Sequence, residues 1–232
     1  MNDFTYVGQE LEIFKDAVNW KSYWLSMLKV YCKGNVADVG AGIGSTVIEG
    51  SKTLNFDRWQ AIEPDPVLFR QLSKNIKILL KENIQSFLGP LSADKGLYDT
   101  ILYIDVLEHI LDDKGELELA ASRLNPGGKL LILAPAHNFL FSQFDSHVGH
   151  YRRYNKNMLK LITPNSLQLE RIFYLDSCGL VLSALNRFVL RSSLPKKSQI
   201  KFWDSLVIPI SNIIDRLLGY RVGKSIVAVW HK

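Results

Sequence analysis

The feature that most constrains this 232-residue chain is a short apolar segment that runs directly into three alternating glycines. Residues 36–39 are apolar enough for a buried strand, and Gly40, Gly42 and Gly44 follow at every second position. Glycine allows unusual backbone dihedral angles and lets a ligand approach the main chain closely. Open α/β sheets bind nucleotide-like ligands where a first strand turns into its helix. The sequence therefore predicts an α/β fold with a nucleotide-like ligand at this turn.

Two residues in this stretch indicate which ligand the turn binds. Ser45 stands where the dinucleotide fingerprint G-x-G-x-x-G has its third glycine. Asp38 precedes the glycines, and a carboxylate there would repel a pyrophosphate but attract an ammonium or sulfonium group. A dehydrogenase is disfavoured for both reasons.

The run Asp38-x-Gly40-x-Gly42-x-Gly44 resembles the first motif of class I S-adenosylmethionine (SAM) dependent methyltransferases. Glu63, Asp105 and the turn at 124–128 follow in the order of the later motifs of that family. The resemblance implies SAM as cofactor and a Rossmann-like α/β fold. The expected sheet has seven mostly parallel strands, of which the last is antiparallel. A helical N-terminal lid and an insertion before the last strand are expected in addition.

The chain is expected to form one methyltransferase domain over residues 1–232. Its parts are a helical lid at 1–33, a cofactor-binding core at 34–175, a helical insertion at 176–222 and the last strand at 223–232. Apolar patterning and turn residues predict strands at 35–39, 59–63, 84–88, 98–104, 129–134, 167–174 and 225–230. Helices are predicted at 44–51, 66–82, 113–124, 155–163, 178–190 and 203–218, the last interrupted at Pro209.

The cofactor-binding residues are expected at the ends of successive strands. Glu63 lies 19 residues after Gly44, close to the spacing at which such folds place a carboxylate on the ribose hydroxyls. In similar enzymes the loop after the third strand holds the adenine, the fourth strand ends near the methionine moiety, and an N-terminal helix, here with Trp20 and Tyr23, closes over the cofactor. The expected set is Asp38, Gly40, Ala41, Gly42, Gly44, Glu63, Pro64, Gly89, Leu91, Asp105 and Val106.

The acceptor site is expected in the stretch 135–154, which follows the fifth strand and holds three of the five histidines. A long loop at this position is usually functional. Histidine suits proton removal from an oxygen acceptor near neutral pH, and the candidates in order are His150, His147 and His137. Tyr151 or Asp105 would orient the acceptor.

The same stretch contains Gly149-His-Tyr-Arg-Arg-Tyr154, which resembles a subgroup of bacterial methyltransferases. Many of these belong among enzymes that modify sugars, lipids or surface polysaccharides. Arg152 and Arg153 could bind a phosphate or carboxylate of the acceptor, or could be solvated surface residues.

A metal is not expected. Asp105-x-x-Glu108-His109 resembles a motif of some metal-dependent O-methyltransferases, and with His137 or His147 it offers ligands for a divalent ion. Similar residues also occur in metal-free relatives, where they hold loops by hydrogen bonds.

Composition favours a cytoplasmic protein. The chain has two cysteines without metal or disulfide spacing, no signal-peptide pattern and no apolar run of membrane-spanning length. Its net charge of +5 is modest, and no nucleic-acid-binding platform is present. The insertion is expected to cover the sheet, or alternatively to contact a membrane or a lipid-linked acceptor through Arg191, Lys196, Lys197, Lys201 and Trp203.

The predicted function is SAM-dependent methyl transfer to a small-molecule acceptor, an oxygen of a sugar, polyol or lipid-linked compound. Two alternatives stay open at this point, since the cofactor half is common to them all. One is N- or C-methylation of a small metabolite, and the other is a non-catalytic SAM-binding regulatory protein.

Overall fold

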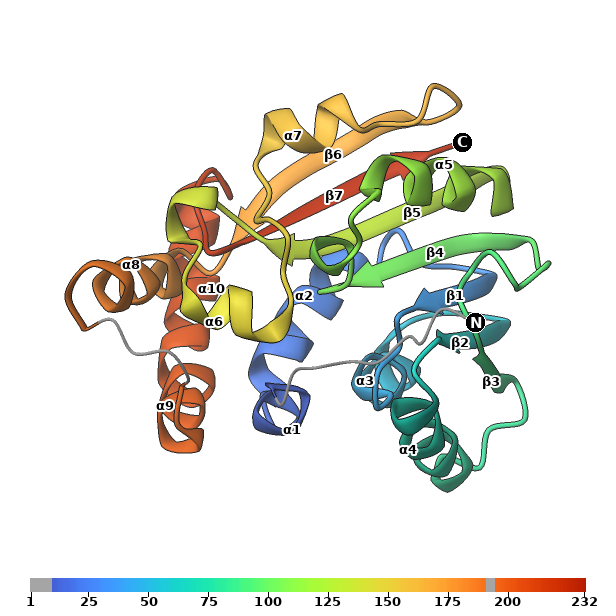
Figure 1. The fold of residues 1–232 in the computed structure, drawn as a ribbon, viewed down its shortest axis with the longest axis horizontal. Helices are drawn as coiled ribbons and strands as arrows, with labels where there is room; N and C mark the ends of the chain where they lie inside the picture. The colour runs from blue at the N-terminus through green and yellow to red at the C-terminus, as the bar shows by residue number, and fades with distance from the viewer. Residues whose placement is uncertain (1–9, 191–194) are drawn as a thin grey trace.

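A computed structural model of the chain describes residues 10–190 and 195–232, and it contains one seven-stranded sheet (Figure 1). The strand order is β3-β2-β1-β4-β5-β7-β6. The strands are β1 (Asn35–Val39), β2 (Arg58–Glu63), β3 (Ile84–Leu88), β4 (Tyr98–Ile104), β5 (Leu124–Pro135), β6 (Gln168–Leu175) and β7 (Ser225–His231). The strand positions agree closely with the sequence prediction.

The last strand, β7, lies between β5 and β6 and runs antiparallel to both, while β1 to β5 pair in parallel. Its side chains alternate between two apolar cores. Val227 and Val229 belong to one core, whereas Ile226, Ala228 and Trp230 belong to the other. A strand buried on both faces reads as a continuous apolar run, as this one does. The predicted seven-stranded, mostly parallel sheet with an antiparallel last strand is therefore confirmed.

Helices cover both faces of the sheet (Figure 1). Residues of α2, α3 and α4 join the core on one face, and residues of α5 and α7 join the core on the other. The helices are α1 (Glu10–Phe14), α2 (Val18–Leu28), α3 (Ser45–Thr53), α4 (Pro66–Ile78), α5 (Asp113–Arg123), α6 (Gln143–Val148), α7 (Lys156–Leu161), α8 (Ser177–Leu185), α9 (Lys197–Phe202) and α10 (Ile208–Leu217). In the described part of the chain, no helix combines the length and the apolar character that crossing a membrane requires.

The insertion differs from the prediction in one respect. The helix expected at 203–218 begins earlier, at Lys197, and continues to Leu217 through a wider π turn at 203–207. Pro209 follows this turn and does not break the helix. A proline ring clashes with the carbonyl four residues before it in a regular helix, and the wider turn just before Pro209 relieves that conflict.

Two other boundaries also moved. The helix predicted at 66–82 ends at Ile78, and Leu80 beyond it has a left-handed backbone (φ 50°) that a helix cannot contain. Strand β5 begins at Leu124, but its register against β4 shifts between the pairs Tyr98–Leu124 and Thr100–Lys129. The predicted turn at 125–128 is therefore present as an irregularity inside the strand.

Candidate active site

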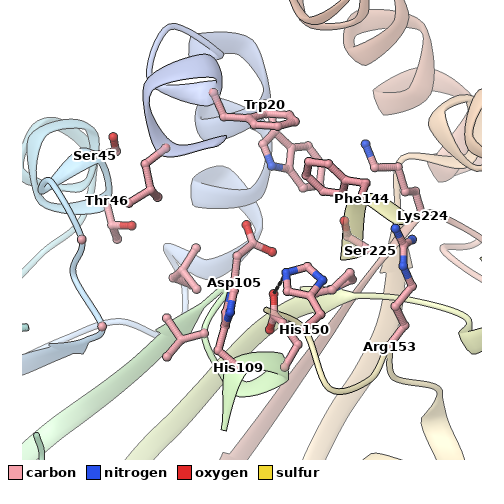
Figure 2. Close-up of a pocket in the computed structure, with 18 of the residues that line it drawn as sticks. Trp20, Ser45, Thr46, Asp105, His109, Phe144, His150, Arg153, Lys224 and Ser225 are labelled. Carbon is pink, nitrogen blue, oxygen red and sulfur yellow. Dashed lines mark ion pairs between the residues drawn. The ribbon is translucent and has the colours of Figure 1, made fainter. Parts of the chain in front are cut away.

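A cavity of about 1180 Å³ opens at the carboxyl ends of β1, β2, β4 and β5. Sites for drug-sized ligands usually measure about 300–1000 Å³, so this one has room for a cofactor together with a second molecule. Figure 2 shows Trp20 of α2 across the cavity from Asp105, His109 and His150. It also shows Lys224 and Arg153 along one further side.

The glycine turn forms one wall of this cavity. The backbone N–H groups of Gly40 and Ala41 both donate to the carbonyl of Ile62, at 2.8 and 3.0 Å. Gly40 has φ +69°, and a Cβ placed there would lie 2.7 Å from a methyl carbon of Val106. Only glycine fits this position, because both its backbone conformation and its close approach to Val106 exclude a side chain.

The acid before the turn lies beneath it. Asp38 is in β1 and 1% exposed, its Oδ2 has no hydrogen-bond partner among the described residues, and burial raises its pKa to about 8. Of the expected cofactor-binding residues, those that line the cavity are Gly40, Ala41, Gly42, Glu63, Pro64, Leu91, Asp105 and Val106. Asp38, Gly44 and Gly89 are not among the described lining residues. Asp38 therefore does not line the cavity, although its motif position suggests that it binds the cofactor.

Glu63 ends β2 with its carboxylate fixed by the backbone. Its Oε2 accepts from the N–H of Gly42 at 2.7 Å, and its Oε1 accepts from the N–H of Asp65 at 2.8 Å. Asp65 in turn caps α4 by accepting from the N–H groups of Val67 and Leu68, as the Asp-Pro pair predicts. Because a carboxylate oxygen has two lone pairs, both oxygens retain acceptor capacity toward the cavity.

Asp105, at the end of β4, has an unusual backbone for its residue type, with φ +54°. Its N–H donates to the carbonyl of Leu133 at 2.8 Å, which holds the residue at the cavity wall. Its side chain is exposed to the cavity. The surrounding cavity walls nevertheless desolvate the carboxyl group and raise its pKa to about 6, although the neighbouring His150 and Lys224 oppose the shift. Strained backbone of this kind gathers at functional sites.

His150 reaches the cavity from the chain after α6, and a buried carboxylate positions its ring. Its Nδ1 lies 2.8 Å from Oδ1 of Asp145, which is 0% exposed. Arg153 binds the same carboxylate through Nε at 2.7 Å and Nη2 at 3.0 Å. Burial alone would raise the pKa of Asp145, but the hydrogen bonds from His150 and Arg153 outweigh it and hold that pKa well below its usual value.

Glu108 lies beside His150 and is fully buried. Its Oε1 is 3.8 Å from Nε2 of His150, and neither of its oxygens has a hydrogen-bond partner within the described residues. Burial raises its pKa well above the usual value, which favours the protonated carboxyl. Burial also lowers the pKa of His109 to about 4, which favours the neutral imidazole.

Glu108, His109 and His150 are the described residues that could hold a metal ion, because one ligand atom from each lies within 4.8 Å of the others. His137 and His147, which the sequence suggested as further ligands, are not part of this group.

The other candidate acceptor-site residues differ in whether they line the cavity. Tyr151 lines the cavity. His147 is exposed on α6, and His137 stacks on Tyr174 with ring centroids 4.9 Å apart. Neither of these histidines lines the cavity as far as the chain is described. Arg152 forms an ion pair with Asp113 and does not reach the cavity.

The two residues expected to form the lid on α2, Trp20 and Tyr23, also differ in position. Trp20 lines the cavity, together with Trp24. Tyr23, the other expected lid residue, turns toward the insertion and donates its hydroxyl to Asp215 at 2.7 Å. Tyr23 therefore joins α2 to α10, and it does not cover a ligand.

Lys224 and Trp203 both line the cavity. Sequence patterns did not indicate Lys224, and they suggested Trp203 only as a contact for a membrane or a lipid-linked acceptor. Lys224 Nζ lies 4.3 Å from the ring centroid of Trp203 and 4.0 Å from Oδ2 of Asp176. Trp203 donates its Nε1–H to the same carboxylate at 2.9 Å. No local motif marks these residues, which come together only when the insertion folds against the start of β7.

Comparisons with known proteins agree with this architecture. A family model described as a methyltransferase domain matches residues 31–174, more than half of the chain. The protein belongs to this methyltransferase family. A search of the curated proteins finds no match.

Solved methyltransferase structures share the fold at low sequence identity. A complex between the Haloferax volcanii Trm112 methyltransferase activator and a protein described as a methyltransferase matches with TM-score 0.62 and 16% identity, covering 97% of this chain and 92% of that one. Coclaurine N-methyltransferase bound to N-methylheliamine and S-adenosylhomocysteine matches with TM-score 0.62 and 13% identity, covering 99% and 83%. Haemonchus contortus phosphoethanolamine N-methyltransferase 2 in complex with SAM matches with TM-score 0.62 and 14% identity, covering 97% of this chain but 57% of that one.

The chain is therefore an enzyme, a SAM-dependent methyltransferase. Its own residues fit the cofactor. The turn at Gly40 excludes a side chain, and Glu63 is held at the end of β2 with acceptor capacity left for vicinal hydroxyls.

Proposed function

We propose that this methyltransferase transfers a methyl group to an oxygen of a small-molecule acceptor, a sugar, a polyol or a lipid-linked compound. The observation that carries the proposal is the His150 ring on the cavity wall, with its Nδ1 fixed at 2.8 Å by Asp145. An oxygen acceptor needs a group that removes its proton, whereas an amine is nucleophilic once neutral. A base oriented by a buried carboxylate supplies that requirement.

SAM brings a methyl group on a positively charged sulfur, which needs little further activation once an acceptor is in line with it. The Gly40–Gly42 turn, Glu63 and Leu91 would hold its nucleoside part, and Asp105 would face its methionine end. Trp20 would cover it. The positions of these residues on the cavity wall support the proposed assignments.

The protein's own groups would then prepare the acceptor. The hydrogen bond to Asp145 favours the His150 tautomer with its proton on Nδ1, which leaves Nε2 able to accept the acceptor's proton. Asp105 and Tyr151 would orient the acceptor. Arg153 would fix Asp145 and keep the imidazole in place, because two of its nitrogens bind that carboxylate.

An anionic group on the acceptor would suit the remaining cations. Nη1 of Arg153 is buried without a hydrogen-bond partner in the described structure, and Lys224 also lines the cavity. Both could bind a phosphate or carboxylate. These two cations therefore favour an acceptor that carries an anionic group.

The wider assignment follows the sequence. We place the enzyme, as one catalytic domain, in the bacterial subgroup with the Gly149–Tyr154 run, acting in the cytoplasm on a small molecule and not on nucleic acid. Both cysteines, Cys32 and Cys178, are free, which supports a reducing compartment. Methylation of nitrogen is the second candidate, since two of the structurally similar enzymes are named as N-methyltransferases.

The test is an acceptor screen with SAM labelled with carbon-13 on its methyl group. S-adenosylhomocysteine formation identifies an acceptor, and the chemical shift of the transferred methyl carbon distinguishes oxygen from nitrogen or carbon. A methyl on nitrogen or carbon would overturn the oxygen assignment. Calorimetric titration with SAM, for the wild type and Glu63→Gln, tests the cofactor residues separately. Unchanged affinity in the variant would remove Glu63 from the cofactor site.

A further inference from the structure

The helical insertion between β6 and β7 has an outer face that is both apolar and basic. On α9 to α10 the exposed apolar side chains recur at helical spacing, on the side opposite to the buried face. They are Phe202, Leu206, Ile210, Ile213 and Leu217, with exposed fractions between 44% and 81%. At 1.5 Å per residue this stripe is about 20 Å long. The apolar core does not include this stripe, because the core contains other positions of the same helices, such as Ile200, Val207 and Ile208.

A second exposed stripe lies on α8 and the turn after it, and α8 packs against α10. Its members are Val181, Leu182, Leu185 and Phe188, which are 39% to 66% exposed. Figure 1 shows α8, α9 and α10 together on the side to which the carboxyl ends of β4 and β5 point. The two stripes are therefore carried by one helical unit.

The acidic residues of this helical unit are buried, whereas its basic residues are exposed. Its acids are Asp176, Asp204 and Asp215, and all three are at most 7% exposed and bonded internally. Its described basic residues are exposed: Arg187, Lys196, Lys197, Lys201, Arg216 and Arg221. Helix α1, which packs against α9, contributes the acid Glu12, but its carboxylate is ion-paired with Lys15 at 2.7 Å. Over 176–190 and 195–222, the surface thus presents positive charge without an exposed acid.

We propose that this face docks on the surface of an anionic lipid bilayer. Aliphatic and phenylalanine side chains on one helix face, with lysines and arginines beside them, fit the boundary between lipid headgroups and acyl chains. A second copy of the chain fits less well, because a symmetric contact would bring the same positive surface together with itself. Trp203, one of the residues expected to contact membrane, is 7% exposed and bonds to Asp176, so it does not take part; Arg191 lies outside the described residues.

The docking face also borders the cavity. Leu182, Leu185 and Phe202 belong to the stripes and at the same time line the cavity wall. An acceptor with a lipid tail could therefore enter the site while its tail stays in the bilayer. This assignment of a lipid-linked acceptor rests on the proposed function, whereas the docking itself does not.

The experiment measures co-sedimentation of the full chain with vesicles of phosphatidylcholine alone and of phosphatidylcholine mixed with phosphatidylglycerol. The wild type is expected to bind the anionic vesicles, and added salt is expected to weaken the binding. Lys197→Gln combined with Lys201→Gln should weaken it about 25-fold, since each lysine near an anionic surface contributes about fivefold. Leu206→Gln combined with Ile213→Gln should weaken it about tenfold.

The matched control is Lys77→Gln combined with Ile78→Gln. It removes an exposed lysine and an exposed isoleucine from α4, at the other end of the molecule, and should leave vesicle binding unchanged. Absence of wild-type binding, or an equal loss in the control, would overturn the proposal. So would a dimer in lipid-free sedimentation that Leu206→Gln with Ile213→Gln dissociates, because a second copy would then cover the face. Calorimetry with SAM on each variant shows whether the fold is intact, and keeps a failure of docking distinct from a failure of methyl transfer.

Discussion

His150 and Asp145 are joined by a hydrogen bond of 2.8 Å at the edge of the cavity, and the carboxylate that orients the ring is inaccessible to solvent. Asp145 is itself held by a local contact. Its carboxylate accepts from the N–H of Ser142 at 2.8 Å and so caps the first turn of α6. One carboxylate thereby connects the start of a short helix, the candidate base and Arg153. The same contacts have consequences for catalysis and for stability that can be measured separately.

Replacing His150 by glutamine should reduce kcat for an oxygen acceptor by about 10²–10⁴-fold, the usual contribution of a general base. SAM affinity should not change, because the proposed role of His150 is to act on the acceptor and not to bind the cofactor. The control is His147→Gln, which removes an exposed imidazole from the same helix region. Steady-state kinetics and calorimetry on both variants check the prediction, and equal activity of the two variants would contradict it.

Asp145 should make the folded state sensitive to acid. Its folded pKa is depressed relative to the unfolded chain, so its stabilising contribution is complete above the unfolded value of about 3.9 and is lost as pH falls below that value. Asp145→Asn should flatten this part of the pH dependence. It should also destabilise the protein by about 3–5 kcal/mol at neutral pH, because Arg153 is left buried without its partner. Urea unfolding across acidic pH measures both effects, and an unchanged pH dependence would remove Asp145 from this role.

Two glycines with similar φ angles allow the cost of backbone strain to be measured separately from the cost of a steric clash. Gly40 and Gly127 have φ of +69° and +75°, but a Cβ at Gly127 meets nothing within 4 Å, whereas a Cβ at Gly40 overlaps Val106. Gly127→Ala should cost about 1–2 kcal/mol of stability from backbone strain alone. Gly40→Ala should cost more, and should also weaken SAM binding because the turn must shift. Equal losses in unfolding and calorimetric experiments would show that the contact with Val106 has no effect.

Metal removal tests the chemistry at Glu108. If His150 acts as a base without a metal, methyl transfer should survive dialysis against a chelator. Loss of activity that Mg²⁺ or Mn²⁺ restores would contradict this, and would assign Glu108, His109 and His150 as ligands, since carboxylate and imidazole donors bind such ions. Metal content of the purified protein, measured by mass spectrometry, gives a second reading that does not depend on the acceptor.

Sequence patterns were sufficient to locate the strands and most of the residues that line the cavity around the glycine turn. The strand positions follow from apolar runs, and Gly40, Gly42 and Glu63 follow from the spacing of the motif, so they could be located without coordinates. Asp38 is buried and does not line the cavity, which the motif could not indicate because a motif gives the position of a residue but not the direction of its side chain. It lies below the turn, in a strand buried on both faces.

The acceptor side was harder to predict because its geometry depends on contacts between distant segments. Three histidines in one stretch looked alike in the sequence, and only the path of the chain after α6 brings His150 to the cavity while His137 packs on Tyr174. Lys224 and Trp203 meet across the insertion and the start of β7 and follow no local pattern. The π turn at 203–207 was also missed, since Pro209 indicates a break but not how the helix accommodates it.

The position of β7 has a consequence for how this protein is made. Strand β6 pairs with the rest of the sheet only through β7. The helical insertion of 176–222 lies between β6 and β7 in the sequence, so it is synthesised before β7. During translation, β5 and β6 must therefore wait with open edges until residues 225–231 leave the ribosome. Unpaired strand edges are prone to aggregation, so the nascent chain should be most vulnerable to aggregation during this interval. A ribosome stalled within the insertion would hold a nascent chain whose cofactor half is nearly complete while its sheet is still divided.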